Sequence, residues 1–574
     1  MSTGATPRWP GPADGSGLGE RVAAGILVGV VALALIVWLT AAVAAVLFGS
    51  GPAPALGDVA SAVARLPSHL ADPREAFAPH ARGALPGPAG FYGAALLVLT
   101  AGVAAGLTLL QLVRWVRGTG VLAVTSSPSR EDSARWARRG DLRALTVRAP
   151  QPGRVTLGRA HGRLLAAEER QSAIVIAPTQ SMKTTGLAVP AILEWDGPVL
   201  ATSVKTDLLR DTIDRRRQLG DVLVFDPTEA TGLDSASWSP LVDCATWHGA
   251  QRTAAAMCAA AQPGGFTLAD ADFWYSAAAK LLGPVLLAAA TVEDGSMADV
   301  VRWVDTQEVD EVRDALQEYG DEDALTAARA TWTRDERQRS SIYTTAETVL
   351  ASYADPRVLA AAYNPEPLAD RLLDGTSSAV YLCAPAHEQA RLRPLLATLV
   401  EQVIAAVYER VTHTGEPLDP PLLLVLDEAA NVAPLASLDT LAATAAGQGI
   451  QLVSVFQDVA QIRERWGTRA ATIVNNHRAK LIGSGIADPD TLDFAARILG
   501  DQEIRQHSTT ASQEGRASTT ESTAYRSLAP PHALRQAEHG TAVLVYGNLP
   551  PARVRLRPWF ADRDLRRLAG RARS

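Results

Sequence analysis

The stretch IAPTQSMKTTGLAVPAILEW, from Ile176 to Trp195, resembles a phosphate-binding loop in which part of the usual pattern is absent. That pattern is G-x-x-x-x-G-K-[ST] at the start of a helix. Lys183 and Thr184 match its end, whereas Ala177 replaces the first glycine and Met182 the second. The loop is therefore a damaged nucleotide site, a working variant, or no nucleotide site at all.

The residues around the loop favour a nucleotide site. SAIVIAP before it predicts a strand, and TTGLAVPAILEW after it predicts a helix. At such a junction, unpaired backbone N–H groups and the helix dipole bind phosphates, the lysine neutralises their charge, and the hydroxyl contacts magnesium. We therefore expect ATP and Mg²⁺ to bind here. The predicted nucleotide-binding residues are Ala177, Pro178, Thr179, Gln180, Ser181, Met182, Lys183, Thr184 and Thr185.

A second apolar strand, PPLLLVLDEAANVAPL, ends in Asp427 and Glu428. In P-loop ATPases a carboxylate at this position orders magnesium, and a second one can accept a proton from the attacking water. An acidic first turn of a helix, favoured by the helix dipole, is the alternative interpretation. Because the loop precedes it, we predict that Thr184 and Asp427 bind Mg²⁺ and that Glu428 is catalytic. Gln457, at the end of the next strand, is the predicted γ-phosphate sensor, or else an ordinary polar residue.

Short apolar runs continue along the chain, bounded mostly by Gly, Pro or Asp and separated in several places by helical stretches. This alternation predicts an α/β fold with a mostly parallel sheet covered by helices on both faces. Between residues 239 and 369 only helical patterns occur, which predicts an all-α insertion. The polar, Ser/Thr-rich segment 507–527 is expected to be a mobile loop. Two strands, GTAVLVYG and ARVRLRP, follow it. The strand-forming runs after the loop and before that segment are GPVLATSV, GDVLVFDP, SSAVYLCAP, PPLLLVLDE, IQLVSVFQD and RAKLIGSG.

Two apolar stretches near the N-terminus, residues 22–48 and 91–113, reach the ~20 residues that a membrane span requires. A cleaved signal peptide is the alternative for the first, but its apolar core exceeds the ~7–15 residues of such peptides. Arginines are more frequent after the second stretch than between the two, which predicts that both termini are cytosolic. We expect four regions: a membrane region 1–117, a first motor segment 118–238, the insertion 239–369, and a second motor segment 370–574.

Composition limits the other classes of function. The net charge of -7 means that any nucleic-acid contact must come from a local basic patch. The three cysteines form no metal-ligand spacing and no disulfide framework. Two basic segments, residues 475–480 and 333–341, are candidate contacts. A solvated turn explains the first equally well, and a solvated helix face explains the second better.

Three long segments, residues 177–209, 426–462 and 475–500, carry a resemblance that no single motif would give. They are similar to type IV secretion coupling proteins, the TraG/TraD-type conjugative ATPases, and most similar to actinobacterial members. The resemblance covers about residues 150–560, and the membrane hairpin also fits. It implies a RecA-like P-loop NTPase motor with an all-α, substrate-facing insertion around Phe273 and Trp274. It also implies a ring, usually a hexamer, at the cytoplasmic membrane.

The family couples a relaxase bound to single-stranded DNA to a secretion channel and uses ATP to move that DNA. Two residues depart from its pattern: Met182 where the family has glycine, and Gln448 where many relatives have an arginine that acts on a neighbour's nucleotide. Three hypotheses follow. The first is an ATP-driven DNA translocase. The second is a non-hydrolysing cargo receptor with a degenerate loop. The third is an FtsK-like or type VII-like pump, which the single candidate P-loop and the lack of a recognisable DNA-reading domain make less favourable.

Overall fold

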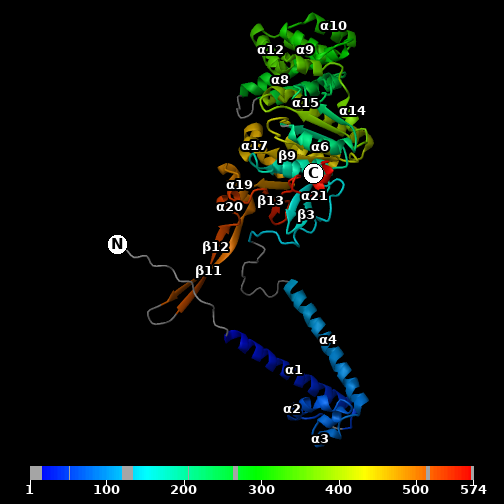
Figure 1. Ribbon diagram of the computed structural model, residues 1–574, viewed down its shortest axis with the longest axis vertical. Coiled ribbons are helices and arrows are strands. Elements are labelled where there is room, and N and C mark those ends of the chain that lie inside the picture. The colour runs from blue at the N-terminus through cyan, green and yellow to red at the C-terminus, as the bar shows by residue number, and fades with distance from the viewer. Residues whose placement is uncertain are drawn as a thin grey trace, which may run out of the picture. The chain divides into compact units, whose positions relative to one another are not determined.

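The computed structural model describes residues 16–50, 52–118, 133–204, 206–262, 269–511 and 517–570. The chain forms two compact units, residues 1–129 and 130–574 (Figure 1). Each unit has a hydrophobic core of its own. We describe them separately.

The first unit consists of two long helices, α1 (Ser16–Phe48) and α4 (Pro88–Gly118), with short helices between them. Small side chains of α1, among them Ala41 and Ala44, pack with Phe91 and Ala94 of α4 and with Phe77. The linking helices are α2 (Leu56–Arg65), η1 (Leu66–Ser68), η2 (Pro73–Ala76) and α3 (Pro79–Arg82).

Apolar side chains on the outside of both long helices remain exposed, among them Leu39 on α1 and Leu97 on α4. Pro88–Gly106 is long and apolar enough to cross a membrane, and the described apolar part of α1, Ala32–Phe48, is shorter. Both helices are therefore compatible with a membrane hairpin. Arg114, Arg117 and Arg130 lie outside the residues whose side chains are described, and the predicted orientation stays a prediction.

A 12-stranded sheet forms the centre of the second unit, in the order β1-β3-β2-β14-β13-β10-β4-β9-β8-β5-β7-β6. The strands from β10 to β6 run parallel to their neighbours, and the strands from β1 to β13 pair antiparallel. The parallel strands are β4 (Ala173–Ile176), β5 (Val199–Ser203), β6 (Val222–Phe225), β7 (Ala379–Cys383), β8 (Leu422–Leu426), β9 (Ile450–Phe456) and β10 (Ala479–Gly483). The antiparallel strands are β1 (Thr146–Val147), β2 (Thr156–Ala160), β3 (Arg163–Ala166), β13 (Thr541–Tyr546) and β14 (Ala552–Arg555).

The parallel strands are mostly apolar and buried because helices cover both faces of the sheet. In β8, Leu423 and Val425 face the cluster that contains α5 (Val189–Glu194) and α6 (Asp207–Arg217). Leu424 and Leu426 face the opposite cluster. The helices on that side are α15 (Gln389–Thr414), α16 (Leu438–Gln448), α17 (Val459–Trp466) and α18 (Ala470–Asn476). The expected α/β architecture is confirmed.

Between β6 and β7 the described residues form helices and connecting turns, as expected for an all-α insertion. Helix α8 is apolar enough to pass as a membrane span, but most of its apolar stretch, Ala271–Thr291, is buried inside the insertion, so it is a core helix. The all-α insertion is thus part of the observed fold, but the residue boundaries predicted for the four regions stay predictions. Its helices are η4 (Pro240–Asp243), α7 (Trp247–Ala261), α8 (Ala269–Thr291), α9 (Met297–Asp305), α10 (Asp310–Tyr319), α11 (Glu322–Trp332), α12 (Glu336–Leu350), η5 (Ala351–Ala354), α13 (Pro356–Ala361) and α14 (Leu368–Leu372).

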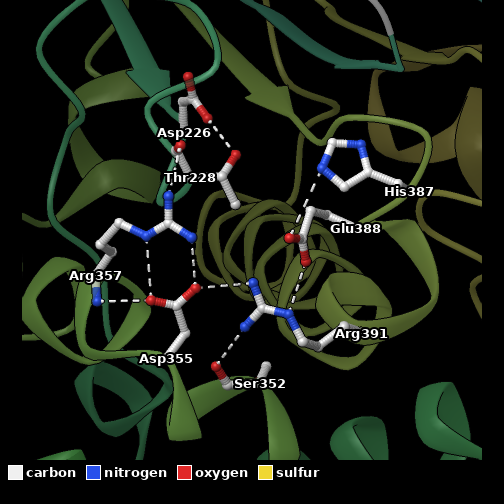
Figure 2. Close-up of polar contacts among 8 residues, drawn as sticks. All are labelled: Asp226, Thr228, Ser352, Asp355, Arg357, His387, Glu388 and Arg391. Atoms are coloured by element: carbon white, nitrogen blue, oxygen red, sulfur yellow. Dashed lines mark hydrogen bonds and ion pairs between the residues drawn. The ribbon is translucent and has the colours of Figure 1, made fainter.

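A cluster of charged side chains joins the insertion to α15 and to the residues that follow β6 (Figure 2). Asp355, between η5 and α13, accepts hydrogen bonds from Arg357 at 2.9 Å and from Arg391 of α15 at 3.0 Å. Arg391 also pairs with Glu388 at 2.7 Å. These contacts hold the pKa of Asp355 down to about 2, chiefly through the hydrogen bond from Arg357.

The prediction of a mobile loop at 507–527 is wrong. Strands β11 (Asp501–Ala511) and β12 (Ala517–Ser527) pair antiparallel as a two-stranded ribbon, and residues 512–516 lie outside the description. The segment is rich in threonine, whose β-branched side chain favours extended backbone. The polar composition was therefore that of a pair of strands and not of a loop. The remaining helices are α19 (Pro489–Leu499), α20 (Pro531–Arg535) and α21 (Arg563–Leu568), with η6 (Gly467–Arg469) between α17 and α18.

Candidate nucleotide site

The candidate loop leaves the carboxyl end of β4 and leads into a helix at Lys183. The first helical turn, η3 (Thr184–Ala188), is a π-helix, and α5 continues from it. Crevices at the carboxyl ends of parallel strands are the common ligand sites of open α/β sheets. Strand β9 lies between β4 and β8. The loop, Asp427 and Gln457 therefore follow three adjacent strands and meet at the same edge of the sheet.

Met182 adopts the backbone conformation for which glycine is normally selected. Its φ is +66°, in the left-handed region that L-residues avoid at a cost of ~1–2 kcal/mol. Its side chain extends toward Gly540, because a Cβ atom added to that glycine would lie 3.1 Å from the Met182 Sδ. Gly540 itself has a φ of +77°. The methionine is thus accommodated by a turn more than 350 residues away in the sequence.

The rest of the loop is fixed by short polar contacts and by close packing. Ser181 is buried and donates from Oγ to the carbonyl of Pro178 at 2.7 Å, and the ring of His539 lies 2.6 Å from the carbonyl of Gln180. A Cβ atom added to Gly483 of β10 would lie only 2.6 Å from the Cβ of Ala177. Ala177 therefore packs where a larger side chain would collide with the neighbouring strand.

Asp427 is 5% exposed and lies against the first helical residue of the loop. The Thr184 hydroxyl donates to its Oδ2 at 3.1 Å and lies 3.3 Å from its Oδ1. Burial raises the pKa of Asp427 to about 6, although the Thr184 hydrogen bond and the charge of Lys183 act in the opposite direction. A hydroxyl and a carboxylate are oxygen ligands of the kind that Mg²⁺ prefers. The residues present fit the predicted Mg²⁺.

Glu428 lies within reach of both the loop and the next strand. Its Oε1 is 3.7 Å from Nζ of Lys183, which is itself buried. The side-chain amide of Gln457 donates to Oε2 of Glu428 at 2.9 Å. Glu428 has a φ of +56°, a strained conformation of the kind found at active sites. The structure thus brings together Lys183, Thr184, Asp427, Glu428 and Gln457, as the sequence predicts.

Asn431 is a site residue that the sequence analysis missed. Its side-chain amide donates to Oε2 of Glu428 at 3.1 Å, so two amides contact this carboxylate. The signal was present, because Asn431 follows Glu428 by three residues, a spacing that a tight turn brings together. The turn 538–541 carried no comparable local signal.

Other polar residues singled out in the sequence have local structural partners. His477 is buried, with its ring nitrogens near Ile473 O at 2.7 Å and Ser454 Oγ at 3.0 Å, and burial lowers its pKa to about 4. Arg478 pairs with Glu168 at 2.9 Å. Gln448 ends α16 just before the amino end of β9, and so lies at the sheet edge opposite the candidate loop.

Residues 132–573 match the family described as "Type IV secretory system Conjugative DNA transfer". The chain belongs to this family. It is 27% identical over 313 residues to the conjugal transfer protein TraG of Escherichia coli, covering 51% of this chain and 49% of that one. It is 24% identical over 467 residues to VirD4 of Agrobacterium fabrum, covering 76% and 67%. It spans about half the length of the Escherichia coli TraG proteins that it matches.

Solved structures of the conjugative coupling protein TrwB share the fold. The unbound form gives a TM-score of 0.58 at 19% identity and covers 74% of this chain and 92% of that one. The complex of TrwB with ADP and Mg²⁺ gives 0.58 at 20% identity, with 74% and 94% covered. The predicted family and RecA-like fold are confirmed.

Proposed function

We propose that this family member is a membrane-anchored, ATP-dependent DNA translocase that couples a relaxase–DNA complex to a type IV secretion channel. The observation that supports it most is the constellation around the loop, in which Thr184 contacts Asp427 and Lys183 lies beside Glu428. ATP with Mg²⁺ is the proposed cofactor pair, and solved complexes of TrwB contain ADP with Mg²⁺ or a non-hydrolysable ATP analogue. The site-residue assignments are part of this proposal.

Each residue has a distinct role in hydrolysis. Backbone N–H groups of residues 179–184 and the helix dipole bind the phosphates, and Lys183 neutralises their charge. When bound, Mg²⁺ neutralises charge on the outer phosphates, and Thr184 and Asp427 are its ligands from this chain. Glu428 accepts the proton of the attacking water. Gln457 senses the γ-phosphate and, together with Asn431, orients Glu428 through side-chain amides at 2.9 and 3.1 Å.

The assembly follows from the same proposal. Helices α1 and α4 anchor the chain in the cytoplasmic membrane with both termini in the cytosol. Copies form a ring, taken as a hexamer, around single-stranded DNA that arrives with a relaxase. Gln448 replaces an arginine that acts between neighbours, so the stimulating cation in this ring comes from another residue. Such arginines contribute ~10³–10⁵ in rate.

A non-hydrolysing cargo receptor is the second candidate, and Met182 is the observation that favours it. A side chain next to the lysine can crowd the β-phosphate. The position of Met182 beside Gly540 argues against this candidate, because its side chain extends toward that turn.

Displacement of a roadblock separates the two functions. The full chain in lipid nanodiscs is given biotinylated single-stranded DNA that carries streptavidin, and ATP is added. We expect ATP-dependent release of streptavidin by the unaltered chain and none by Lys183→Ala. DNA binding without release by either protein would favour the receptor.

A further inference from the structure

A cavity of about 440 Å³ lies where the insertion meets the motor, lined by α7 of the insertion and by α15 and α16 beside the sheet. On α7 its lining is a row of small side chains, Ala255, Ala256 and Ala259, and it also includes Ile404 of α15 and Leu441 of α16. Small-ligand sites measure ~300–1,000 Å³, are mostly apolar and often lie between domains. The size, the lining and the place of this cavity therefore fit a small organic molecule.

One carboxylate in the cavity has no counter-charge. Glu401, on α15, is half-buried, and its Oε1 accepts a hydrogen bond from the Ser437 hydroxyl at 3.0 Å. Burial raises the pKa of Glu401, the bonds from Ser437 act in the opposite direction, and no basic side chain of the described residues contributes. Arg252 also lines the cavity, but it pairs with Glu409 at 2.7 Å and with Asp243 at 3.3 Å. The charge of Glu401 is thus left for a ligand to neutralise.

Other polar groups of the lining already have partners within the protein. Gln402 is buried, its Oε1 accepts from the Trp238 indole at 3.1 Å, and its Nε2 donates to the carbonyl of Pro240 at 3.0 Å. The Thr398 hydroxyl donates to a carbonyl of its own helix at 2.6 Å. A lone carboxylate in a mostly apolar space favours a cation that carries N–H donors, because charge-assisted hydrogen bonds are the strong ones.

The cavity touches both the insertion and the segment that carries the candidate hydrolytic residues. Ser437 ends the connection from β8 to α16, and the same connection includes Glu428 and Asn431. A molecule in the cavity contacts α7 on one side and this connection on the other. Its binding therefore stabilises the arrangement of insertion and motor in which the cavity is present.

We propose that this cavity binds a small organic cation, an amidinium or ammonium group on an apolar body. The cationic group pairs with Glu401, and the apolar body lies against the alanines of α7. This site uses no residue of the candidate nucleotide site, so the inference stands or falls independently of the proposed function.

The test uses three probes that share one ring and differ in charge: benzamidine, benzamide and benzoate. Each is titrated by calorimetry into the full chain in detergent. Glu401→Gln removes the charge and keeps the shape of the side chain, and Ala256→Leu fills part of the cavity. The matched control is Glu347→Gln, because Glu347 is exposed on α12 and does not line the cavity. Thermal melting establishes that each variant is folded.

We expect the unaltered chain to bind benzamidine at least about tenfold more tightly than benzamide, because a hydrogen bond to a charged group is stronger than a neutral one. Benzoate should bind most weakly, since its charge has the same sign as that of Glu401. Glu401→Gln should bind benzamidine and benzamide equally, Ala256→Leu should weaken benzamidine binding about tenfold, and Glu347→Gln should match the unaltered chain.

Three results would overturn the assignment. The first is a lack of benzamidine binding by the unaltered chain, and the second is equal affinity of that chain for benzamidine and benzamide. The third is a preference for benzamidine that persists in both Glu401→Gln and Ala256→Leu, which would place the cation at another acidic site.

Discussion

Asp427 and Thr184 are 243 residues apart in the sequence, yet the Thr184 hydroxyl donates to the Asp427 carboxylate at 3.1 Å. Their contact forms because β4 and β8 are separated only by β9 and end at the same edge of the sheet. The carboxylate is buried without a full counter-charge, and burial raises its pKa to about 6. The ionised form of the Asp427 carboxyl is therefore unfavourable until a cation binds beside it.

Asp427→Asn should therefore stabilise the chain in the absence of nucleotide and magnesium while abolishing hydrolysis. The pKa of a folded carboxyl raised from 3.8 to about 6 favours its protonated form, so the stabilisation present at low pH is lost as pH rises through 6. This change in pKa corresponds to about 3 kcal/mol. Melting curves should show no difference between the two proteins near pH 4 and a higher Tm for Asp427→Asn above pH 6. An equal Tm at pH 8 would contradict the buried-charge account.

Glu428→Gln should bind ATP but hydrolyse it 10²–10⁴-fold more slowly, because general-base catalysis contributes about that much.

Asn431→Ala should lower kcat about tenfold and leave the KM for ATP nearly unchanged, since Asn431 positions Glu428 without touching the phosphates. Steady-state kinetics separates the two constants. Asn476→Ala is the control, because its amide contacts the carbonyl of Asp439, away from the loop. A change in KM alone for Asn431→Ala would place that residue in nucleotide binding instead.

Gly540→Val should raise the KM for ATP and lower the stability by about 1–2 kcal/mol, since it adds a β-branched side chain at a φ of +77°. Part of the effect on both KM and stability comes from collision of the new side chain with Met182, whose sulfur lies 3.1 Å from the added Cβ position. The double variant Met182→Gly/Gly540→Val should therefore recover some affinity. Additive effects of the two changes on KM would show that Met182 and Gly540 do not interact.

Leu97→Arg should reduce the fraction of the chain that is recovered in the membrane. Leu97 is exposed on the apolar part of α4, and an arginine inside the bilayer costs about 2.5–3.5 kcal/mol on insertion scales. Leu70→Arg is the matched control. Leu70 is also exposed, but it belongs to the segment that connects α1 to α4 and not to either long helix. Carbonate extraction of isolated membranes distinguishes the two. Equal recovery of both variants would argue that α4 does not cross the membrane.

Much of the site could be read from the sequence because its residues follow strands with strong apolar patterns. Lys183, Asp427 and Gln457 each come at or shortly after the end of a buried strand, and the order of these strands brings them together. Asn431 was missed although it lies in the same turn as Glu428. The accommodation of Met182 by Gly540 could not be predicted, since it depends on a turn joined to the loop only by tertiary packing.

The fold was harder to predict where the pattern of apolar residues in the sequence does not reveal which side chains are buried. The ribbon of β11 and β12 forms a separate two-stranded sheet, so its strands lack the apolar alternation that marks a half-buried strand. The polar run 475–480 was ambiguous for the opposite reason. His477 is fully buried and hydrogen-bonded, and a histidine within a basic run gives no indication of this in sequence.

The central claim is that the loop with Met182 is a working ATP site of a DNA-dependent motor. The most direct test is ATP hydrolysis by the full chain in detergent, with and without single-stranded DNA. Met182→Gly is measured beside it, and Lys183→Ala is the blank. The account predicts that the unaltered chain hydrolyses ATP, that DNA stimulates it, and that Met182→Gly changes the rate by no more than a few-fold. Hydrolysis by Met182→Gly alone, with none by the unaltered chain, would contradict it.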